Sequence, residues 1–369
     1  MNERHTAPLE TPVSEVADQV SETCPLFDIR TVNERQTGAP VGSIALSVEE
    51  LLTKVRESAP DVKLRGWVMC SEGLRSLAAV KQLWALGGTG FSSVAGGFRD
   101  WREAGLPVAF PAGLDSGQAE RYARHLVMPQ VGAEGQRKLL DSRILLVGLG
   151  GLNSPVAMYL AAAGVGTLGL VDFDSVEQSN LQRQVVHGES SVGLAKAESA
   201  QQRIRDINSA VNTVVIDREV SRENAASLVE NWDIVIDGTD NFATRYALNA
   251  ACVQHSIPLV YGAVMRFQGQ VAVFWPAAKS LPGSSCFQCL MPRPPAAGEA
   301  PGCAEAGVLG VLPGIVGALQ ASEALKLALD IGRPLVGELL MVDALTMEFR
   351  KMLIPVNRSC SCCGSESPG

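Results

Sequence analysis

The segment from Arg143 to Lys196 constrains the fold of this 369-residue chain more than any other part of it. An apolar run, Ile144 to Val147, leads into the loop Gly-Leu-Gly-Gly-Leu-Asn at Gly148–Asn153, and Asp172 ends the next apolar run. A glycine loop after one strand, with an acidic residue about 20 positions further on at the end of the next, marks a nucleotide-binding βαβ unit. The sequence therefore predicts a parallel sheet with a nucleotide at the carboxyl ends of its strands.

Basic residues follow this unit at once. Ser-Asn-Leu-Gln-Arg-Gln occupies Ser179–Gln184, and Lys196 comes shortly after. A nicotinamide-dependent dehydrogenase, which the glycine loop also permits, does not need Arg183 or Lys196. Two cations close to the phosphates favour chemistry at the phosphates over hydride transfer.

Charge and hydropathy exclude several classes of protein. The net charge of −8 gives no electrostatic reason to expect nucleic acid or an anionic membrane as a partner. Residues 144–171 carry no charge and are long enough for a membrane helix, but they contain the glycine loop and Pro155. A buried strand–helix–strand unit is equally apolar, so we expect no membrane span. No signal peptide is visible in the polar residues Met1–Glu10, and we expect a cytoplasmic protein.

The chain is long enough for two domains, and residues 106–117 are rich in helix and strand breakers. We predict an N-terminal domain at 15–110, a linker at 111–119 and a second domain at 120–369. Both show alternating strands and helices, which implies parallel sheets. In the second domain, residues 258–264 and 269–276 look like strands without a helix between them, which predicts a mixed edge. The expected elements are strands at 26–29, 66–69, 92–94 and from 144, 168, 214 and 234, and helices at 48–57, 76–85, 241–249 and 314–329.

A reactive cysteine is expected in the first domain. Cys70-Ser-Glu-Gly-Leu-Arg75-Ser follows a strand and opens a helix, where backbone N–H groups and the helix N-terminus favour a thiolate. Arg75 adds positive charge. A buried cysteine at a strand end is the plainer interpretation. With Phe27-Asp-Ile-Arg30, the glycine pair Gly96-Gly97 and Gly105-Leu-Pro, however, residues 15–110 resemble the rhodanese-like domain, although that family's Gly-His-Ile-Pro-Gly-Ala turn is degenerate at 38–43.

The rest of the chain, from Glu120 to Cys363, resembles the molybdopterin-synthase and thiazole-biosynthesis adenylyltransferases, the MoeB/ThiF family related to ubiquitin-activating enzymes. The resemblance implies a Rossmann-like doubly wound fold that binds ATP and Mg²⁺. It assigns Asp240 to Mg²⁺, and it assigns Arg124 to the ATP site of a neighbouring subunit, hence a homodimer. It assigns nucleotide contacts to Gly148, Gly150, Gly151, Asp172, Ser179, Asn180, Leu181, Gln182, Arg183, Lys196, Asp240 and Asn241.

Each of these residues taken alone has a simpler explanation. Lys196 would more often be a surface lysine, Arg124 a charge on a helix, and Asp240 the cap of the helix that follows it. Their combination makes coincidence improbable. Asn153 departs from the family, which usually has glycine there; we expect a small local shift where the helix packs on the strand.

The nine cysteines include two pairs of metal-ligand spacing, Cys286-x-x-Cys289 and Cys360-x-x-Cys363. Two such pairs complete a Cys₄ zinc site, and a redox dithiol is the alternative. Cys362 lies inside the second pair and could replace a neighbour. In related activating enzymes a cysteine at the position of Cys303 can form an acyl-thioester or acyl-disulfide, and in others it is dispensable. Cys24 and Cys252 have no such context.

Together these features predict an enzyme with two activities. The second domain would adenylylate the C-terminal Gly-Gly tail of a small ubiquitin-like sulfur-carrier protein. Cys70 would carry a persulfide, supplied by a donor such as a cysteine desulfurase, to yield a thiocarboxylate. The carrier of molybdopterin synthase is favoured, with thiamine, cysteine or tRNA thiolation pathways as alternatives. A dehydrogenase and a non-catalytic binding platform are the rival hypotheses.

Overall fold

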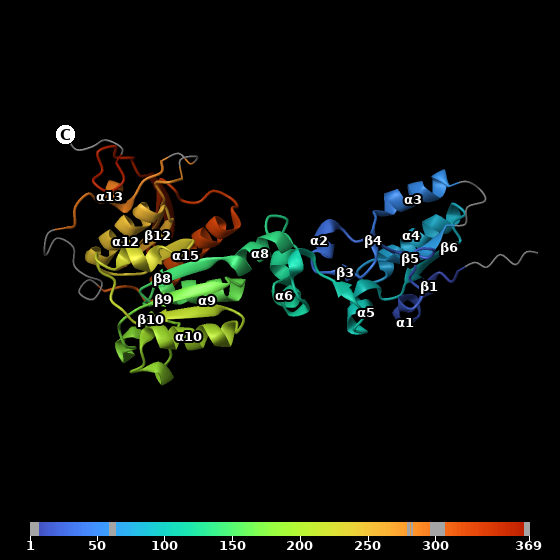
Figure 1. Cartoon of the computed structure of the whole chain (residues 1–369), viewed down its shortest axis with the longest axis horizontal. Coiled ribbons are helices and arrows are strands. Elements are labelled where there is room, and N and C mark those ends of the chain that lie inside the picture. The colour runs from blue at the N-terminus through green and yellow to red at the C-terminus, as the bar shows by residue number, and fades with distance from the viewer. Residues whose placement is uncertain (1–6, 59–63, 279–280, 282, 296–306, 365–369) are drawn as a thin grey trace, which may run out of the picture. The chain divides into compact units, whose positions relative to one another are not determined.

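Two sheets built on parallel strands organise the computed structural model, one in each half of the chain (Figure 1). The structure describes residues 7–58, 64–278, 281, 283–295 and 307–364. The chain divides into two compact units, residues 1–137 and 138–369, each with a sheet and core of its own.

The first unit has a five-stranded sheet in the order β1-β6-β5-β2-β4, parallel throughout. Apolar side chains cover both faces, and Val68 and Cys70 point to one face while Trp67 and Met69 point to the other. Its strands are β1 (Glu10–Thr11), β2 (Leu26–Asp28), β4 (Ile44–Ala45), β5 (Arg65–Met69) and β6 (Gly90–Val94), and β3 (Ala39–Pro40) pairs separately with β7 (Val108–Ala109).

Helices cover this first sheet. The helix α3 has the predicted bounds, Val48–Glu57, because Ser47 and Glu50 form a reciprocal N-terminal cap. The other helices up to Glu103 are α1 (Val13–Ala17), α2 (Val32–Arg35), α4 (Leu74–Ala85) and α5 (Gly97–Glu103). Four short helices follow in the sequence, namely η1 (Pro111–Gly113), α6 (Ser116–Arg121), α7 (Ala123–Leu126) and α8 (Gly132–Asp141), and α8 carries the boundary between the units.

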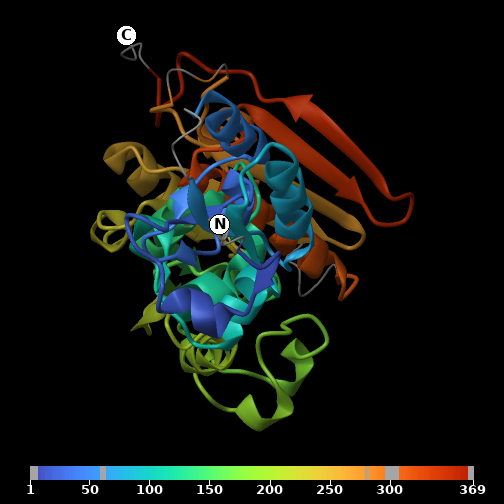
Figure 2. The same cartoon turned by 90° about the vertical axis from the view of Figure 1, so that its right-hand side faces the viewer.

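The second unit has an eight-stranded sheet in the order β10-β9-β8-β11-β12-β13-β14-β15. The strands are parallel as far as β12 and antiparallel beyond it, so the mixed edge predicted from the sequence is confirmed. The hairpin β14–β15, red in Figure 2, extends that edge and was not predicted. The strands are β8 (Arg143–Val147), β9 (Thr167–Val171), β10 (Asn212–Ile216), β11 (Ile234–Asp237), β12 (Leu259–Met265), β13 (Gln268–Phe274), β14 (Glu338–Asp343) and β15 (Glu348–Leu353).

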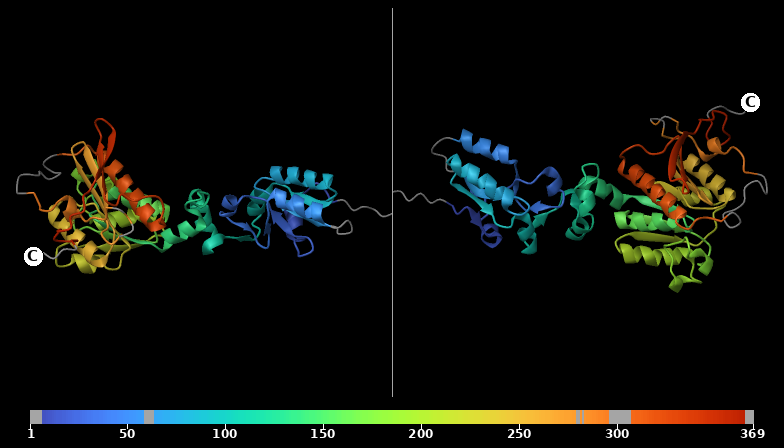
Figure 3. Two further views of the ribbon diagram at one scale, coloured as in Figure 1. Left: turned by 90° about the horizontal axis from the view of Figure 1, so that it is seen from above. Right: turned by 180° about the vertical axis from the view of Figure 1, so that it is seen from behind.

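Helices pack on both faces of the second sheet, as in a doubly wound α/β fold (Figure 3). The core on one face joins α9, α10 and α15, and the core on the other joins α11, α12 and α13. The expected α/β class is therefore confirmed. The helices are α9 (Asn153–Ala163), η2 (Gln178–Asn180), η3 (Glu189–Ser191), α10 (Lys196–Ile207), α11 (Ala225–Val229), α12 (Phe242–His255), α13 (Phe287–Leu290) and α15 (Leu312–Leu329).

Candidate functional site

A cavity opens at the carboxyl ends of β8, β9 and β11. The strand order reverses between β8 and β11, and such switch points are where open α/β sheets bind ligands. The glycine loop follows β8, Asp172 follows β9, and the segment Gly238–Asn241 follows β11. The cavity is lined by eight of the predicted nucleotide residues, namely Gly148, Gly150, Gly151, Asp172, Arg183, Lys196, Asp240 and Asn241.

The carboxylate of Asp172 accepts hydrogen bonds from two backbone N–H groups, one in the glycine loop and one just after Asp172 itself. Leu149 N donates to its Oδ2 at 2.6 Å, and Asp174 N donates to its Oδ1 at 2.9 Å. Burial raises the pKa of Asp172 above its usual range, although both N–H groups favour the ionised form. The loop itself turns at Gly148, whose φ of 78° is a left-handed conformation that favours glycine. These hydrogen bonds fix the carboxylate of Asp172 against the glycine loop.

The two predicted cations approach the cavity from different elements. Lys196 is the first residue of α10, and its Nζ lies 2.8 Å from Oδ2 of Asp174. Arg183 donates from Nη1 to the carbonyl of Ser179 at 3.1 Å. The ammonium of Lys196 therefore forms an ion pair with Asp174, a residue that the sequence did not single out.

Of the predicted stretch from Ser179 to Arg183, only Arg183 is among the cavity-lining residues of the described chain. Asn180 instead caps the turn, since its Oδ1 accepts from Glu177 N at 3.2 Å. Gln184 also lines the cavity, and its buried Oε1 has no hydrogen-bond partner in the described part of the structure. Gln184 was not assigned to the nucleotide site from the sequence. Its N–H donates to the carbonyl of Asn180, four residues earlier, and this helical turn places Gln184 beside Arg183 at the cavity.

A buried ion pair fixes the segment that carries Asp240. Asp237 is buried, accepts from the Oγ1 and N–H of Thr239, and lies 3.7 Å from Nε of Arg245. Arg245 in turn donates to the carbonyl of Thr239 at 2.7 Å. The cap of α12 is Asn241, which accepts from Thr244 N, so Asp240 does not have the capping role considered above. Arg245 was not predicted, because only the fold brings α12 against the end of β11.

The loop of Cys70 surrounds its sulfur with donors. Gly73 N, Ser76 N and Ser76 Oγ lie 3.2, 3.3 and 3.4 Å from Sγ. Burial alone would raise the pKa of the Cys70 thiol, but these donors outweigh burial, and the pKa lies below its usual value. The predicted preference for a thiolate thus has a geometric basis.

Arg75 does not face Cys70 alone. Its guanidinium pairs with Glu34, which also accepts from Ser71 Oγ at 2.7 Å. Burial opposes the ionisation of Glu34, yet the donors from Arg75, Ser71 and Thr31 lower its pKa to about 2. The charge that the sequence assigned to the cysteine loop is therefore shared with a carboxylate 41 residues away in the chain.

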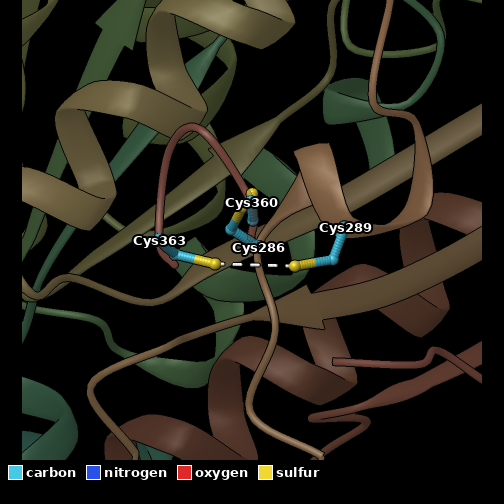
Figure 4. Close-up of side chains that lie close together, drawn as sticks. All are labelled: Cys286, Cys289, Cys360 and Cys363. Carbon is cyan, nitrogen blue, oxygen red and sulfur yellow. Dashed lines mark hydrogen bonds between the residues drawn. The ribbon is translucent and has the colours of Figure 1, made fainter. Parts of the chain in front are cut away.

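Four cysteines meet in the second unit. The Sγ atoms of Cys286, Cys289, Cys360 and Cys363 all lie within 4.8 Å of one another, and Figure 4 shows them converging from two chain segments. The pairs Cys286–Cys360 and Cys289–Cys363 are 3.6 and 3.5 Å apart. Tetrahedral zinc with Zn–S bonds of about 2.3 Å needs sulfurs about 3.8 Å apart, so the cluster fits this ion.

The remaining cysteines differ in their surroundings. Cys362 accepts from Nδ2 of Asn249 at 3.2 Å and is not one of the four grouped ligands. Cys252 is buried in α12, and Cys24 is half-buried. Cys303 lies outside the described residues. Among the residues that the structure describes, no helix is both long and apolar enough to span a membrane.

The structure is a doubly wound α/β fold with a cavity, lined by the glycine loop, at the switch point of its sheet. The model of the ThiF family matches residues 122–363, and the chain belongs to this family. It is 48% identical over 251 residues to a protein of Haloferax volcanii named SAMP-activating enzyme E1, with 68% of this chain and 91% of the relative covered. It is 47% identical over 249 residues to the sulfur carrier protein adenylyltransferase of Thermus thermophilus, with 68% and 92% covered.

A longer similarity reaches a relative with two named activities. The maize protein called adenylyltransferase and sulfurtransferase MOCS3-2 is 40% identical over 329 residues, which cover 89% of this chain and 67% of the relative. Among solved structures, Escherichia coli MccB is similar with a TM-score of 0.60 at 20% identity, covering 74% of this chain and 79% of that chain. At that identity the likeness supports the fold alone.

Proposed function

We propose that this chain is an enzyme that uses ATP to adenylylate the C-terminal glycine of a small ubiquitin-like sulfur-carrier protein, and that it then transfers sulfur to that carboxyl. The observation that carries the proposal is the cavity that unites the glycine loop, Asp172, Arg183, Lys196 and Asp240 in a member of the ThiF family. Relatives named for a sulfur carrier and for sulfurtransfer support it.

The cavity suits attack by a carboxylate on an α-phosphate. The carrier's carboxylate oxygen forms a bond to the α-phosphorus, the bond to the β-phosphate breaks, and pyrophosphate leaves. Arg183 and Lys196 neutralise the negative charge that this reaction gathers, and no protein nucleophile is needed. The ion pair of Lys196 with Asp174 at 2.8 Å holds the ammonium in place until phosphate oxygens compete for it.

Two metal ions belong to the proposal. Asp240 would hold Mg²⁺, which supplies further charge neutralisation at the triphosphate. Cys286, Cys289, Cys360 and Cys363 would hold Zn²⁺ as a closed structural site, since four thiolates leave no open coordination position. This ion would anchor the C-terminal segment against α13.

The first unit would act as a rhodanese-like sulfurtransferase. The Cys70 thiolate attacks the terminal sulfur of a donor persulfide, such as that of a cysteine desulfurase, and the donor leaves as a thiolate. The resulting persulfide attacks the carbonyl of the adenylate and expels AMP, giving an acyl disulfide. A second thiol then attacks the Cys70 sulfur, forms a disulfide with it and releases the thiocarboxylate, and an external thiol reductant returns Cys70 to its thiol. The alternative route passes through Cys303, which displaces AMP from the adenylate to form an acyl-thioester that the Cys70 persulfide then attacks.

The assembly and pathway follow from the family resemblance. The proposed domains are 15–110 and 120–369, joined by 111–119, in a cytoplasmic homodimer in which Arg124 reaches the neighbouring ATP site. The favoured carrier is that of molybdopterin synthase. Arg124 lies in α7 and is exposed, as such a contact requires.

Exchange of labelled pyrophosphate into ATP tests the adenylylation step. We expect exchange only when a carrier with a Gly-Gly tail is present, and loss of exchange when that tail is removed. Absence of exchange with every carrier of the same organism would contradict the proposal, and exchange without a carrier would point to another carboxylate substrate.

A further inference from the structure

The carboxamide of Asn153 lies at the junction between the glycine loop and β11. Asn153 opens α9 and is fully buried. Its Nδ2 donates to the carbonyls of Gly148 at 2.8 Å and Val147 at 3.0 Å, and it lies 3.5 Å from that of Ile236. One side chain thus links the end of β8, the first residue of the loop and the end of the neighbouring strand.

Gly238 provides the space for this side chain. A Cβ at position 238 would lie 2.5 Å from Nδ2 of Asn153 and 2.9 Å from the carbonyl oxygen of Gly148. The N–H of Gly238 also donates to the carbonyl of Val147 at 2.9 Å, the same oxygen that Asn153 contacts. Asn153 and Gly238 are therefore sterically matched.

A second buried amide holds the same segment from α15. Nε2 of Gln320 donates to the carbonyl of Asp237 at 2.8 Å, and a Cβ at Gly262 would overlap its carboxamide. Asn153 and Gln320 are both fully buried, so neither bond competes with water. The end of β11 is thus held from two helices, because Asn153 of α9 contacts the carbonyl of Ile236 and Gln320 of α15 contacts the next carbonyl, that of Asp237.

This arrangement separates the two parts of the nucleotide site by a fixed distance. The glycine loop lies on one side of the Asn153 amide, and Asp240 follows Gly238 by two residues on the other. We propose that Asn153 is a positioning residue that sets the glycine loop against the Asp240 segment, so that the phosphates and their divalent cation are bound together. This inference rests on the proposed function, since it requires MgATP in the cavity.

The test compares Asn153→Ala with a matched control, Asn208→Ala. Asn208 is also a buried asparagine, and its Nδ2 donates to the carbonyl of Ala161 at 2.9 Å, near the other end of α9. Calorimetric titration with MgATP should show about tenfold weaker binding for Asn153→Ala, because the glycine loop and the Asp240 segment are then no longer held together before the ligand is bound. A tenfold change corresponds to about 1.4 kcal/mol, which is the size of one net hydrogen bond. Asn208→Ala should lower the melting temperature without changing the dissociation constant of MgATP.

A double-mutant cycle guards against a variant that merely fails to fold. Gly238→Ala should weaken MgATP binding by collision with the carboxamide of Asn153. Asn153→Ala/Gly238→Ala should lose less MgATP affinity than the sum of the losses in the two single variants, because the collision with the carboxamide is removed and only the approach to the Gly148 carbonyl remains. Equal MgATP affinity of wild type and Asn153→Ala, or strictly additive effects in the cycle, would overturn the inference alone. Failure of wild-type protein to bind MgATP would overturn the proposed function as well.

Discussion

Cys70 illustrates how a single side chain is prepared by its backbone. Its sulfur accepts from two N–H groups and one hydroxyl, and the hydroxyl of Ser76 is in turn contacted by Ser93 at 2.9 Å. All of these groups are buried, so the donors are not shared with water. The environment of Sγ therefore favours a thiolate.

Removal of the Ser76 hydroxyl tests this account at the scale of one residue. In Ser76→Ala we expect the midpoint of Cys70 alkylation by iodoacetamide to move to higher pH, because the thiolate loses a donor that lowers the pKa. Ser92→Ala is the control, since Ser92 is equally buried but bonds to Thr11 instead. The extent of alkylation at each pH is measured by mass spectrometry of the Cys70 peptide. The same alkylation midpoint in wild type, Ser76→Ala and Ser92→Ala would refute the role of the hydroxyl.

At the scale of elements, the start of α5 supports the Cys70 loop. Gly96 and Gly97 both have left-handed φ values, and Phe98 N and Arg99 N donate to the carbonyls of Cys70 and Ser71. A Cβ at Gly97 would overlap the Cys70 carbonyl and lie 2.8 Å from Gly73 N. The helix can therefore meet the loop only through glycine.

Two glycine substitutions separate backbone strain from collision. Gly97→Ala should abolish persulfide formation on Cys70, because the loop must move. Gly105→Ala has the same sign of φ but meets nothing within 4 Å, so it should cost only about 1–2 kcal/mol of stability. Mass spectrometry of Cys70 after incubation with a sulfur donor, with melting curves for both variants, measures this; similar persulfide yields would contradict the account.

The cysteine pairs join two further elements, α13 and the C-terminal segment. We expect wild-type protein to contain about one zinc per chain. Cys289→Ser should lose most of the zinc and melt at a lower temperature. Cys362→Ser should keep the zinc and the wild-type melting temperature, since Cys362 is outside the cluster. Metal analysis of the purified variants decides this, and loss of zinc in Cys362→Ser with retention in Cys289→Ser would reverse the ligand assignment.

Sequence reasoning succeeded at this scale where a signal is local. The strands β8 and β9 are apolar runs followed by a glycine and an aspartate, and β11 is an apolar run that ends in an aspartate. The glycine loop and each cysteine pair are short contiguous motifs. The hairpin β14–β15 was missed because every residue of β15 is exposed, which leaves no buried face to give a clear alternation. Asp174, Arg245 and the Asn153–Gly238 match could not be predicted, since each depends on contacts that form only in the fold.

At the scale of the whole molecule, the fusion of two units has a chemical reason. When one chain carries the persulfide and also binds the carrier's acyl-adenylate, the two groups meet at an effective concentration in the millimolar range if the linker is long enough to bring them together. The reactive adenylate then has less time to hydrolyse. We therefore expect the two activities to be separable by mutation but productive only together.

The proposed homodimer, in which each ATP site uses residues of both subunits, predicts that two inactive variants complement each other. Arg124→Ala and Arg183→Ala should each be inactive in pyrophosphate exchange, with losses of about 10²–10³-fold for a charge-stabilising residue. Co-refolded or co-expressed mixtures should regain roughly a quarter of wild-type activity, because half of the dimers are mixed and each has one intact site. Activity no greater than that of the separate variants would exclude a shared site.

The most direct measurement is the intact mass of the carrier protein after incubation with the enzyme, MgATP and a persulfide donor. The account predicts that wild-type enzyme replaces one oxygen of the carrier's C-terminal carboxylate by sulfur. Cys70→Ser should leave the carrier unsulfurated while still supporting pyrophosphate exchange, and Arg183→Ala should block exchange while Cys70 still gains a persulfide. A thiocarboxylate formed by Cys70→Ser, or by wild type without ATP, would contradict the central claim that adenylylation and sulfur transfer are coupled in this chain.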